Sequence, residues 1–265
     1  MQKAKILVYT SSATEIPLRE GGTHQVGIFL GELVEPLEPL IEAGHSVTFF
    51  SPNGKGCVID KASYKLSNWG LSKSKMEHAK HYFETKLQEL GIGTPGKISD
   101  LLNDKAELCT YDAVFIPGGH APMTDILHSN WLQSNAYNPE TGELLLHFHN
   151  SNKTTAAICH GSAALAAAPE VNGKWIYSGY DMTCVSMAAE RLTEDIPFCN
   201  IGGHMPDYPV HILERLGAKV HTKMLGLSNV VECNELITGQ DPYSAKELGE
   251  KLLAKIEHQL KHQQA

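Results

Sequence analysis

The segment Ala157-Ile158-Cys159-His160-Gly161 combines residue types that could perform nucleophilic chemistry. An apolar stretch, 154–158, predicts a strand that runs directly into a thiol flanked by small residues two positions away on either side. This is the pattern of a nucleophile elbow, a strand–turn–helix corner with the nucleophile at its tip. The helix N-terminus would favour the thiolate, and the His160 N–H would point at an oxyanion on a substrate bound to Cys159. The alternative is a buried structural cysteine in an alanine-rich core segment.

A second candidate follows another apolar stretch, in Phe115-Ile116-Pro117-Gly118-Gly119-His120. Glycines at the end of a strand let backbone amides approach a ligand closely. Gly118 and Gly119 could therefore supply a second oxyanion donor, and His120 could reach into the same crevice. A plain Pro-Gly-Gly turn is the alternative, and the presence of the elbow in the same chain favours the functional interpretation.

Glu32 is the third candidate, because it lies between the apolar triplet 28–30 and the pair Leu33-Val34. If its side chain faces inward, desolvation would raise its pKa and suit it to proton transfer. From this pattern alone a solvated position on the helix surface is the favoured interpretation. Glu35 competes for the same role on a neighbouring face.

The elements around these candidates predict an α/β fold. Apolar runs predict strands at 5–10, 46–51, 112–116 and 154–159, two short strands within 230–237, and helices over 25–42, 71–91, 140–150, 209–216 and 243–261. This alternation favours a mostly parallel sheet covered by helices on both faces. Ligands of such sheets bind beyond the carboxyl ends of the strands, where Ser11-Ser12, Gly118-Gly119-His120 and Cys159-His160 lie.

Histidine spacing predicts no metal site, although the chain has 14 histidines. Three pairs lie close along the sequence: His78 and His81, His147 and His149, and His258 and His262. The first and third pairs would each share a helix face, but neither has an acidic or cysteine partner spaced as in a zinc-protease helix. We expect solvated surface histidines, no metal and no cofactor.

Composition excludes several classes of partner. The 265 residues carry a formal net charge of −8, which disfavours binding to nucleic acid or to an anionic membrane. The chain shows neither the apolar stretch of a signal peptide nor the roughly 18 apolar residues of a membrane span. Scattered spacing of the cysteines at 57, 109, 159, 184, 199 and 233 indicates reduced thiols. Together these features predict a cytoplasmic protein.

Taken in order, these motifs resemble the ThiJ/PfpI superfamily, relatives of the class I glutamine amidotransferases. The chain is most similar to the branch of heat-inducible chaperones and glutathione-independent glyoxalases (glyoxalase III). Supporting stretches are 27–36, 47–54 and 236–242. The resemblance implies a flavodoxin-like fold and one domain over 1–265, with insertions near 60–100 and 170–206. The sequence differs from the family pattern at two places. Ala121-Pro122 follows Gly-Gly-His where family members often have glycine, and Ser162 follows Cys-His-Gly where proline is frequent.

The resemblance also implies roles for the candidates. Cys159 becomes the nucleophile, His160 its partner and Glu32 the acid beside the sulfur, which reverses the interpretation of Glu32 from its pattern alone. A third, orienting acid is implied after the strand that follows the nucleophile, and the best local match is Glu190.

The implied activity converts 2-oxoaldehydes such as methylglyoxal into 2-hydroxy acids through a cysteine hemithioacetal. Alternatives are a holdase chaperone acting on unfolded protein clients, and a cysteine peptidase, amidase or protein deglycase that uses the same elbow. The family further implies a homodimer.

Overall fold

A seven-stranded sheet forms the centre of the protein in a computed structural model that describes residues 3–132, 134–196 and 201–262. The spatial order is β14-β15-β9-β6-β1-β4-β5. Neighbouring strands are parallel except β14 and β15, which pair as an antiparallel hairpin at one edge. The strands are β1 (Lys5–Tyr9), β4 (Ser46–Ser51), β5 (Gly96–Lys97), β6 (Ala113–Ile116), β9 (Thr154–Ile158), β14 (Val230–Cys233) and β15 (Leu236–Gly239). The predicted α/β class with a mostly parallel sheet is confirmed.

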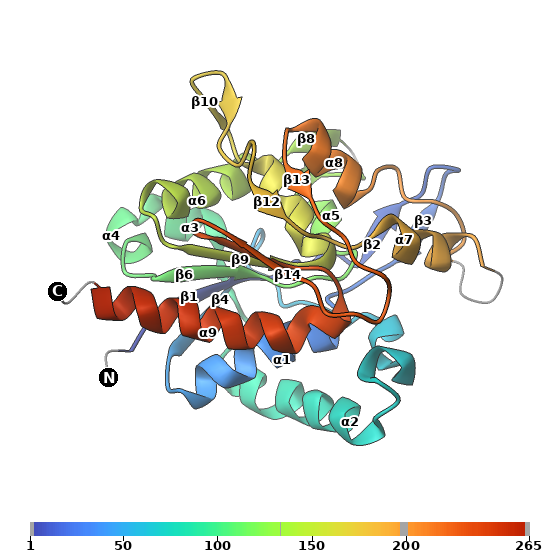
Figure 1. The fold of residues 1–265 in the computed structure, drawn as a ribbon, viewed down its shortest axis with the longest axis horizontal. Helices are drawn as coiled ribbons and strands as arrows, with labels where there is room; N and C mark the ends of the chain where they lie inside the picture. Colours follow the sequence, from blue (N-terminus) through green and yellow to red (C-terminus); the bar gives the residue numbers. More distant parts are fainter. Residues whose placement is uncertain (1–2, 133, 197–200, 263–265) are drawn as a thin grey trace.

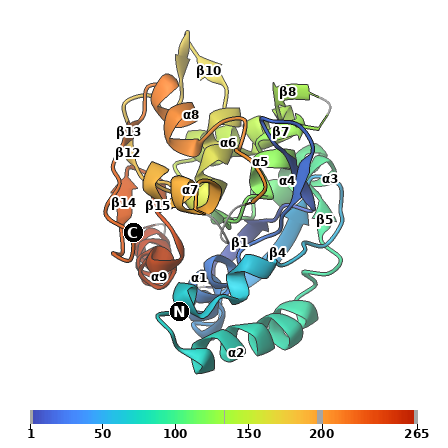
Figure 2. The same cartoon turned by 90° about the vertical axis from the view of Figure 1, so that its right-hand side faces the viewer.

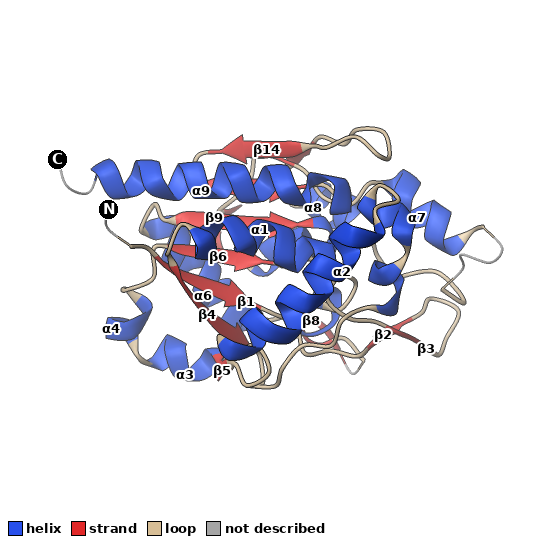
Figure 3. Cartoon of the chain, turned by 90° about the horizontal axis from the view of Figure 1, so that it is seen from below, coloured by secondary structure: helices blue, strands red, loops and turns tan. Residues whose placement is uncertain are grey.

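Helices cover both faces of this sheet (Figure 1). One face carries α1 (Leu30–Glu42) and α9 (Ala245–His262), with α2 (Lys73–Tyr82) outside them, as Figure 3 shows from below. The other face carries α3 (Ile98–Asn103), α6 (Pro139–Asn150), α8 (Pro209–Arg215) and a 3₁₀ helix, η4 (Cys159–Ala167). Short helices α4 (Lys105–Leu108), α5 (Pro122–Asp125) and α7 (Met187–Glu194) complete the layers.

Short two-stranded pairs and helical turns lie in the connections outside the seven-stranded sheet. They comprise β2 (Glu15–Pro17) with β3 (Thr23–Gln25), β7 (His128–Asn130) with β8 (Ser134–Tyr137), β10 (Glu170–Val171) with β11 (Lys174–Trp175), the parallel pair β12 (Asp181–Met182) and β13 (Lys219–Val220), the 3₁₀ turns η1 (Lys61–Tyr64), η2 (Leu66–Trp69) and η5 (Pro242–Ser244), and the π-helical turn η3 (Phe83–Leu87).

The core follows from the alternation of side chains along buried strands. In β1, Ile6 and Val8 pack in the cluster shared with α1 and α9, whereas Leu7 and Tyr9 pack in the cluster shared with α3 and α6. β6 and β9 are buried along their whole length. Because parallel strands are covered on both sides, continuous apolar runs are the pattern expected of them.

Two predicted helices differ from the observed ones. The helix predicted from residue 25 begins at Leu30, because Thr23–Gln25 pairs with β2 and Ile28 forms an isolated bridge to Ile59. The helix predicted over 71–91 is regular only at Lys73–Tyr82 and continues through η3. Apolar periodicity predicted helix in both places, but backbone pairing with a distant segment overrode it in the first.

None of the described helices combines the length and apolar character needed to cross a bilayer. The region 60–100 holds η1, η2, α2 and η3, and the region 170–206 holds the β10–β11 hairpin, β12 and α7. Cys199 lies outside the described residues. The single-domain boundary, the cytoplasmic location and the homodimer stay predictions.

The contact between α1 and α9 gives a stability test at Gly249. A methyl group there would lie 2.8 Å from the Pro36 Cα and 2.9 Å from the Glu35 carbonyl oxygen. Gly249→Ala should therefore lower the free energy of unfolding by about 1–3 kcal/mol through overpacking. The opposite effect would be expected in an isolated helix, where the helix propensity of alanine is more favourable than that of glycine by about 1 kcal/mol. The exposed neighbouring variant Glu250→Ala should stay within about 0.5 kcal/mol of the wild type. Urea unfolding measures both, and an unchanged or more stable Gly249→Ala protein would contradict this packing.

Candidate active site

Cys159 sits at a sharp corner where β9 ends and η4 begins. Its φ of 57° lies in the left-handed region, which costs a non-glycine residue about 1–3 kcal/mol and is concentrated at functional sites. The corner is tight, since a side chain at Gly161 would lie 2.5 Å from the Pro117 carbonyl oxygen. The strand, the strained corner and the small residue after it therefore form the elbow geometry that the sequence pattern predicts.

His160 connects the thiol to a buried carboxylate. Its Nδ1 lies 3.4 Å from Cys159 Sγ, and its Nε2 lies 2.8 Å from Glu190 Oε1. Glu190 is 1% exposed and lies in the first turn of α7, which the Ser186 side chain caps by accepting a hydrogen bond from the Ala189 N–H. Figure 2 views the molecule from the side on which α7 lies. The structure thus brings together the three residues expected to form a Cys–His–acid arrangement.

His120 stacks against this arrangement from the neighbouring strand. Its ring centroid lies 4.0 Å from that of His160, and its Nε2 is 3.9 Å from Glu190 Oε2. Burial, with smaller contributions from the neighbouring His160 and His24, holds the pKa of His120 well below its usual range, so its imidazole is neutral near pH 7. The turn before it depends on Gly119, whose φ is 95° and whose α-carbon faces the Gly27 carbonyl oxygen.

Glu32 lies on the opposite side of the thiol and is completely buried. It occupies the first turn of α1, whose preceding residue Phe29 donates its N–H to the Gly118 carbonyl oxygen at 3.1 Å. A side chain at Gly118 would overlap the Glu32 carboxyl and lie 2.8 Å from Cys159 Cβ. Glycine is therefore needed at this position to let the carboxyl reach the thiol.

Burial controls the ionisation of Glu32 and Cys159. Desolvation raises the pKa of Glu32 well above its usual range, although the Cys159 thiol and the Gly119 N–H both favour its charged form. Neither Glu32 oxygen has a hydrogen bond of normal geometry within the described residues. Desolvation and the charge of Glu32 also raise the pKa of the Cys159 thiol well above its usual range.

The raised pKa of Cys159 corrects one expectation. The elbow was expected to depress this pKa through a helix N-terminus, but the segment that follows is a 3₁₀ helix, and burial beside Glu32 raises the pKa instead. The oxyanion roles of the Gly119 and His160 backbone N–H groups stay predictions.

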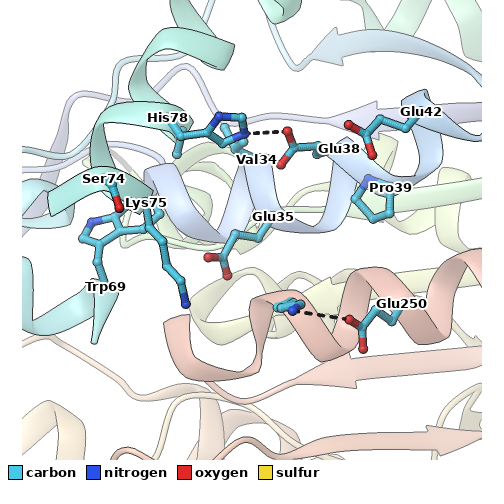
Figure 4. Close-up of a pocket in the computed structure, with 12 residues that line it drawn as sticks. Val34, Glu35, Glu38, Pro39, Glu42, Trp69, Ser74, Lys75, His78 and Glu250 are labelled. Atoms are coloured by element: carbon cyan, nitrogen blue, oxygen red, sulfur yellow. Dashed lines mark hydrogen bonds and ion pairs between the residues drawn. The ribbon is translucent and has the colours of Figure 1, made fainter. Parts of the chain in front are cut away.

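Glu35, the candidate that competes with Glu32, is drawn in Figure 4 among the residues that line a separate pocket. Glu35 points into a different pocket of about 550 Å³ between α1, α2 and α9, with Lys75 and Lys246 in its lining. Burial raises the pKa of Glu35, and the two lysines oppose that rise. In the same pocket His78 contacts Glu38 at 2.6 Å and Lys246 lies 3.8 Å from Glu250. Glu35 thus belongs to a charged surface pocket and Glu32 to the thiol site.

Three charged or ionisable side chains near the site were missed by sequence reasoning. Asp60 and Asp241 both raise the pKa of Glu32, and His24 lowers the pKa of His120. Asp241 belongs to the stretch 236–242 that supports the family resemblance, which was the available signal for it. Asp60 and His24 come from segments that approach only through the bridge and hairpin before α1, so no local pattern reveals them.

The arrangement places the Cys159 thiol between His160 and Glu32, two side chains that can each donate or accept a proton. It also gathers possible metal donors, since one ligand atom from each of His120, His160 and Glu190 lies within 4.8 Å of the others. Both properties arise at the carboxyl ends of β6 and β9, where ligands of parallel sheets bind.

Comparison with known proteins finds relatives that match almost the whole chain. Residues 28–255 match the model of the DJ-1/PfpI family. The chain is 28% identical over 256 residues to the protein/nucleic acid deglycase HchA of Pseudomonas aeruginosa, a match that covers 95% of this chain and 80% of that protein. It is 27% identical over 249 residues to the protein of the same name from Staphylococcus aureus, covering 93% and 78%.

Solved structures share the fold. The Rapid Encystment Protein 24 kDa of Francisella tularensis superimposes with a TM-score of 0.76 at 20% identity, covering 96% of this chain and 99% of that one. Glyoxalase III from Candida albicans superimposes with a TM-score of 0.73 at 18% identity, covering 95% and 96%. The predicted flavodoxin-like α/β fold is confirmed.

The buried carboxyl predicts an unusual pH dependence of stability. Unfolded Glu32 ionises near its ordinary pKa, whereas folded Glu32 keeps its proton to higher pH, so the native state loses stability as pH rises above about 4.5. Each pKa unit of elevation corresponds to about 1.4 kcal/mol. Glu32→Gln removes this ionisation. The melting temperature of the variant minus that of the wild type should therefore increase as the pH is raised from 4 to 8. Calorimetry across that range measures the difference, and a difference independent of pH would contradict the buried, proton-retaining state of Glu32.

Proposed function

Since this chain belongs to the DJ-1/PfpI family, we propose that it is a glutathione-independent glyoxalase that converts methylglyoxal-type 2-oxoaldehydes into 2-hydroxy acids. The observation that carries the proposal is the buried Cys159 thiol with His160 on one side and Glu32 on the other. A protein thiol in this position can replace the free thiol that an aldehyde would otherwise need. The glyoxalase III name of a structural neighbour is in keeping with this chemistry.

Activation of the thiol begins with the tautomer of His160. Glu190 accepts a hydrogen bond from Nε2–H, which leaves the Nδ1 lone pair directed at the Cys159 sulfur. The thiol can then give its proton to Nδ1 as the sulfur attacks the aldehyde carbon. A new S–C bond forms, the carbonyl oxygen takes the charge beside the His160 backbone N–H, and protonation gives a hemithioacetal.

The next step moves a proton between the two substrate carbons. A base removes the proton from the carbon bonded to sulfur, an enediolate forms, and the neighbouring carbon is protonated. The product is a thioester of the 2-hydroxy acid on Cys159, and water hydrolyses it to release the acid and the thiol. The sum is one oxoaldehyde plus one water giving one hydroxy acid, so no redox cofactor is consumed.

Glu32 is suited to this proton transfer by its surroundings. Its raised pKa keeps a proton available next to the substrate, and once it has given that proton up it can act as the base. Its contact with Cys159 has a second effect, because two buried acidic groups side by side cannot both be ionised. A protonated Glu32 therefore accompanies the thiolate and can donate a hydrogen bond to it.

Deglycation is the second candidate function, because the two bacterial relatives carry the name protein/nucleic acid deglycase. In that reaction the same thiol would attack the aldehyde-derived carbon of an adduct with an amine. The S–C bond forms as the C–N bond breaks, and the amine leaves with the proton of the thiol. The two activities separate when a preformed adduct is supplied with an excess scavenger of free aldehyde. A deglycase then releases hydroxy acid faster than the adduct dissociates on its own, whereas a glyoxalase does not.

Removal of the thiol should abolish the proposed reaction. We expect Cys159→Ala to form no lactate from methylglyoxal above the uncatalysed rate in the absence of glutathione, because no hemithioacetal can form. Chiral lactate assays measure the product. The exposed Cys109, which lies outside the site, provides the matched control, and Cys109→Ala should retain full activity.

The assay is decisive when both variants have wild-type melting temperatures. Retention of more than a few per cent of the activity by Cys159→Ala would exclude the covalent mechanism. Loss of activity in both variants would show that the readout depends on folding and not on the thiol at the elbow.

A further inference from the structure

The Nε2 atom of His120 has no hydrogen-bond partner in the described part of the chain, and the proposed reaction does not use this imidazole. Its side chain is 16% exposed, which makes it the most open of the three polar groups at this end of the site. In the tautomer with the proton on Nδ1, this Nε2 atom carries a lone pair that a ligand can take. The unpartnered atom, Nε2, faces the Glu190 carboxylate at 3.9 Å.

We propose that His120, His160 and Glu190 form a binding site for a divalent transition-metal ion of the zinc type, and that the bound ion switches the thiol off. Two imidazole nitrogens and one carboxylate, with a fourth position open to water, are a donor set that zinc accepts. Sequence spacing could not reveal it, because the three residues come from the ends of β6 and β9 and from α7.

The distances between the three donor atoms suit a zinc ion after small movements of the side chains. Zinc lies about 2.0–2.2 Å from such donors, which places two tetrahedral donors about 3.3 Å apart. The observed separations of 2.8 Å between His160 and Glu190 and 3.9 Å between His120 and Glu190 lie on either side of that value. All three donor atoms lie within 4.8 Å of one another.

The electrostatic environment favours a cation. The carboxyl groups of Asp60 and Asp241 lie close enough to affect the ionisation of the site, and Glu32 lies beyond the thiol. A dipositive ion at the site would therefore meet several carboxyl groups from separate segments of the chain.

Metal binding would reverse the role of His160. The ion takes Nε2, so the proton of the neutral imidazole moves from Nε2 to Nδ1, and Nδ1 becomes a donor toward Cys159 Sγ. A ring that donates to the sulfur cannot accept the thiol proton. The inhibition rests on the proposed function, whereas the binding of the metal does not.

Zinc titration of the full chain against a chromophoric chelator tests the site. We expect one tightly bound ion that depends on the three donors, so that His120→Gln and Glu190→Gln each lower the affinity at least tenfold. Cys159→Ala should keep the same stoichiometry, since the sulfur is not a donor in this set. The exposed pair His258 and His262, whose Nε2 atoms lie 3.0 Å apart, is a competing site on the surface.

His262→Gln is therefore the matched control. Retention of the tight ion in His262→Gln and its loss in His120→Gln support the proposal, and the reverse pattern overturns it. Cobalt provides a readout that does not depend on the chelator. A tetrahedral visible spectrum without a thiolate charge-transfer band is expected, and a strong thiolate band, or loss of the ion in Cys159→Ala, would overturn the assigned donor set.

Inhibition is measured separately. Zinc should suppress lactate formation over the concentration range in which it binds, and a chelator should restore it. Tight binding without inhibition would overturn the switch but leave the proposed activity intact. If the chain forms no lactate at all, the proposed function fails while the titration still decides whether the metal site exists.

Discussion

Two acidic groups, the Cys159 thiol and the Glu32 carboxyl, share one water-poor space, and the rest of the site depends on that contact. In such a space a second negative charge is far more costly than the first. The fold is built to maintain the contact. A left-handed backbone at Cys159 turns the thiol out of the sheet, and the missing side chain at Gly118 lets the first turn of α1 bring the carboxyl against it.

The same constraint explains why the site lowers stability. An ionisable carboxyl without a normal hydrogen bond, a non-glycine residue at positive φ and a neutral buried imidazole each disfavour the native state. Local rules are expected to fail in this way at functional sites, where the surrounding core compensates. Here that core includes the fully buried β6 and β9 and the packing of α1 against α9.

The sequence predicted the ends of β6 and β9 and the elbow because continuous apolar runs followed by glycine or by a thiol are local patterns. It could not decide between Glu32 and Glu35, since both lie on one helix and only the packing of α1 determines which one faces the thiol. Glu190 came from resemblance alone, because it approaches His160 across 30 residues of chain. The raised pKa of Cys159 was also beyond prediction, since it depends on burial among acids from separate segments.

The proposed reaction requires the Cys159 sulfur to form a covalent bond with the substrate during turnover. Rapid quenching after mixing the protein with methylglyoxal, followed by peptide-resolved mass spectrometry, detects such a bond. We expect a transient mass increase of one methylglyoxal on the peptide that carries Cys159, which rises and decays as lactate appears. Lactate formed at the full rate with no adduct on that peptide, or an adduct that persists after turnover ends, would contradict it.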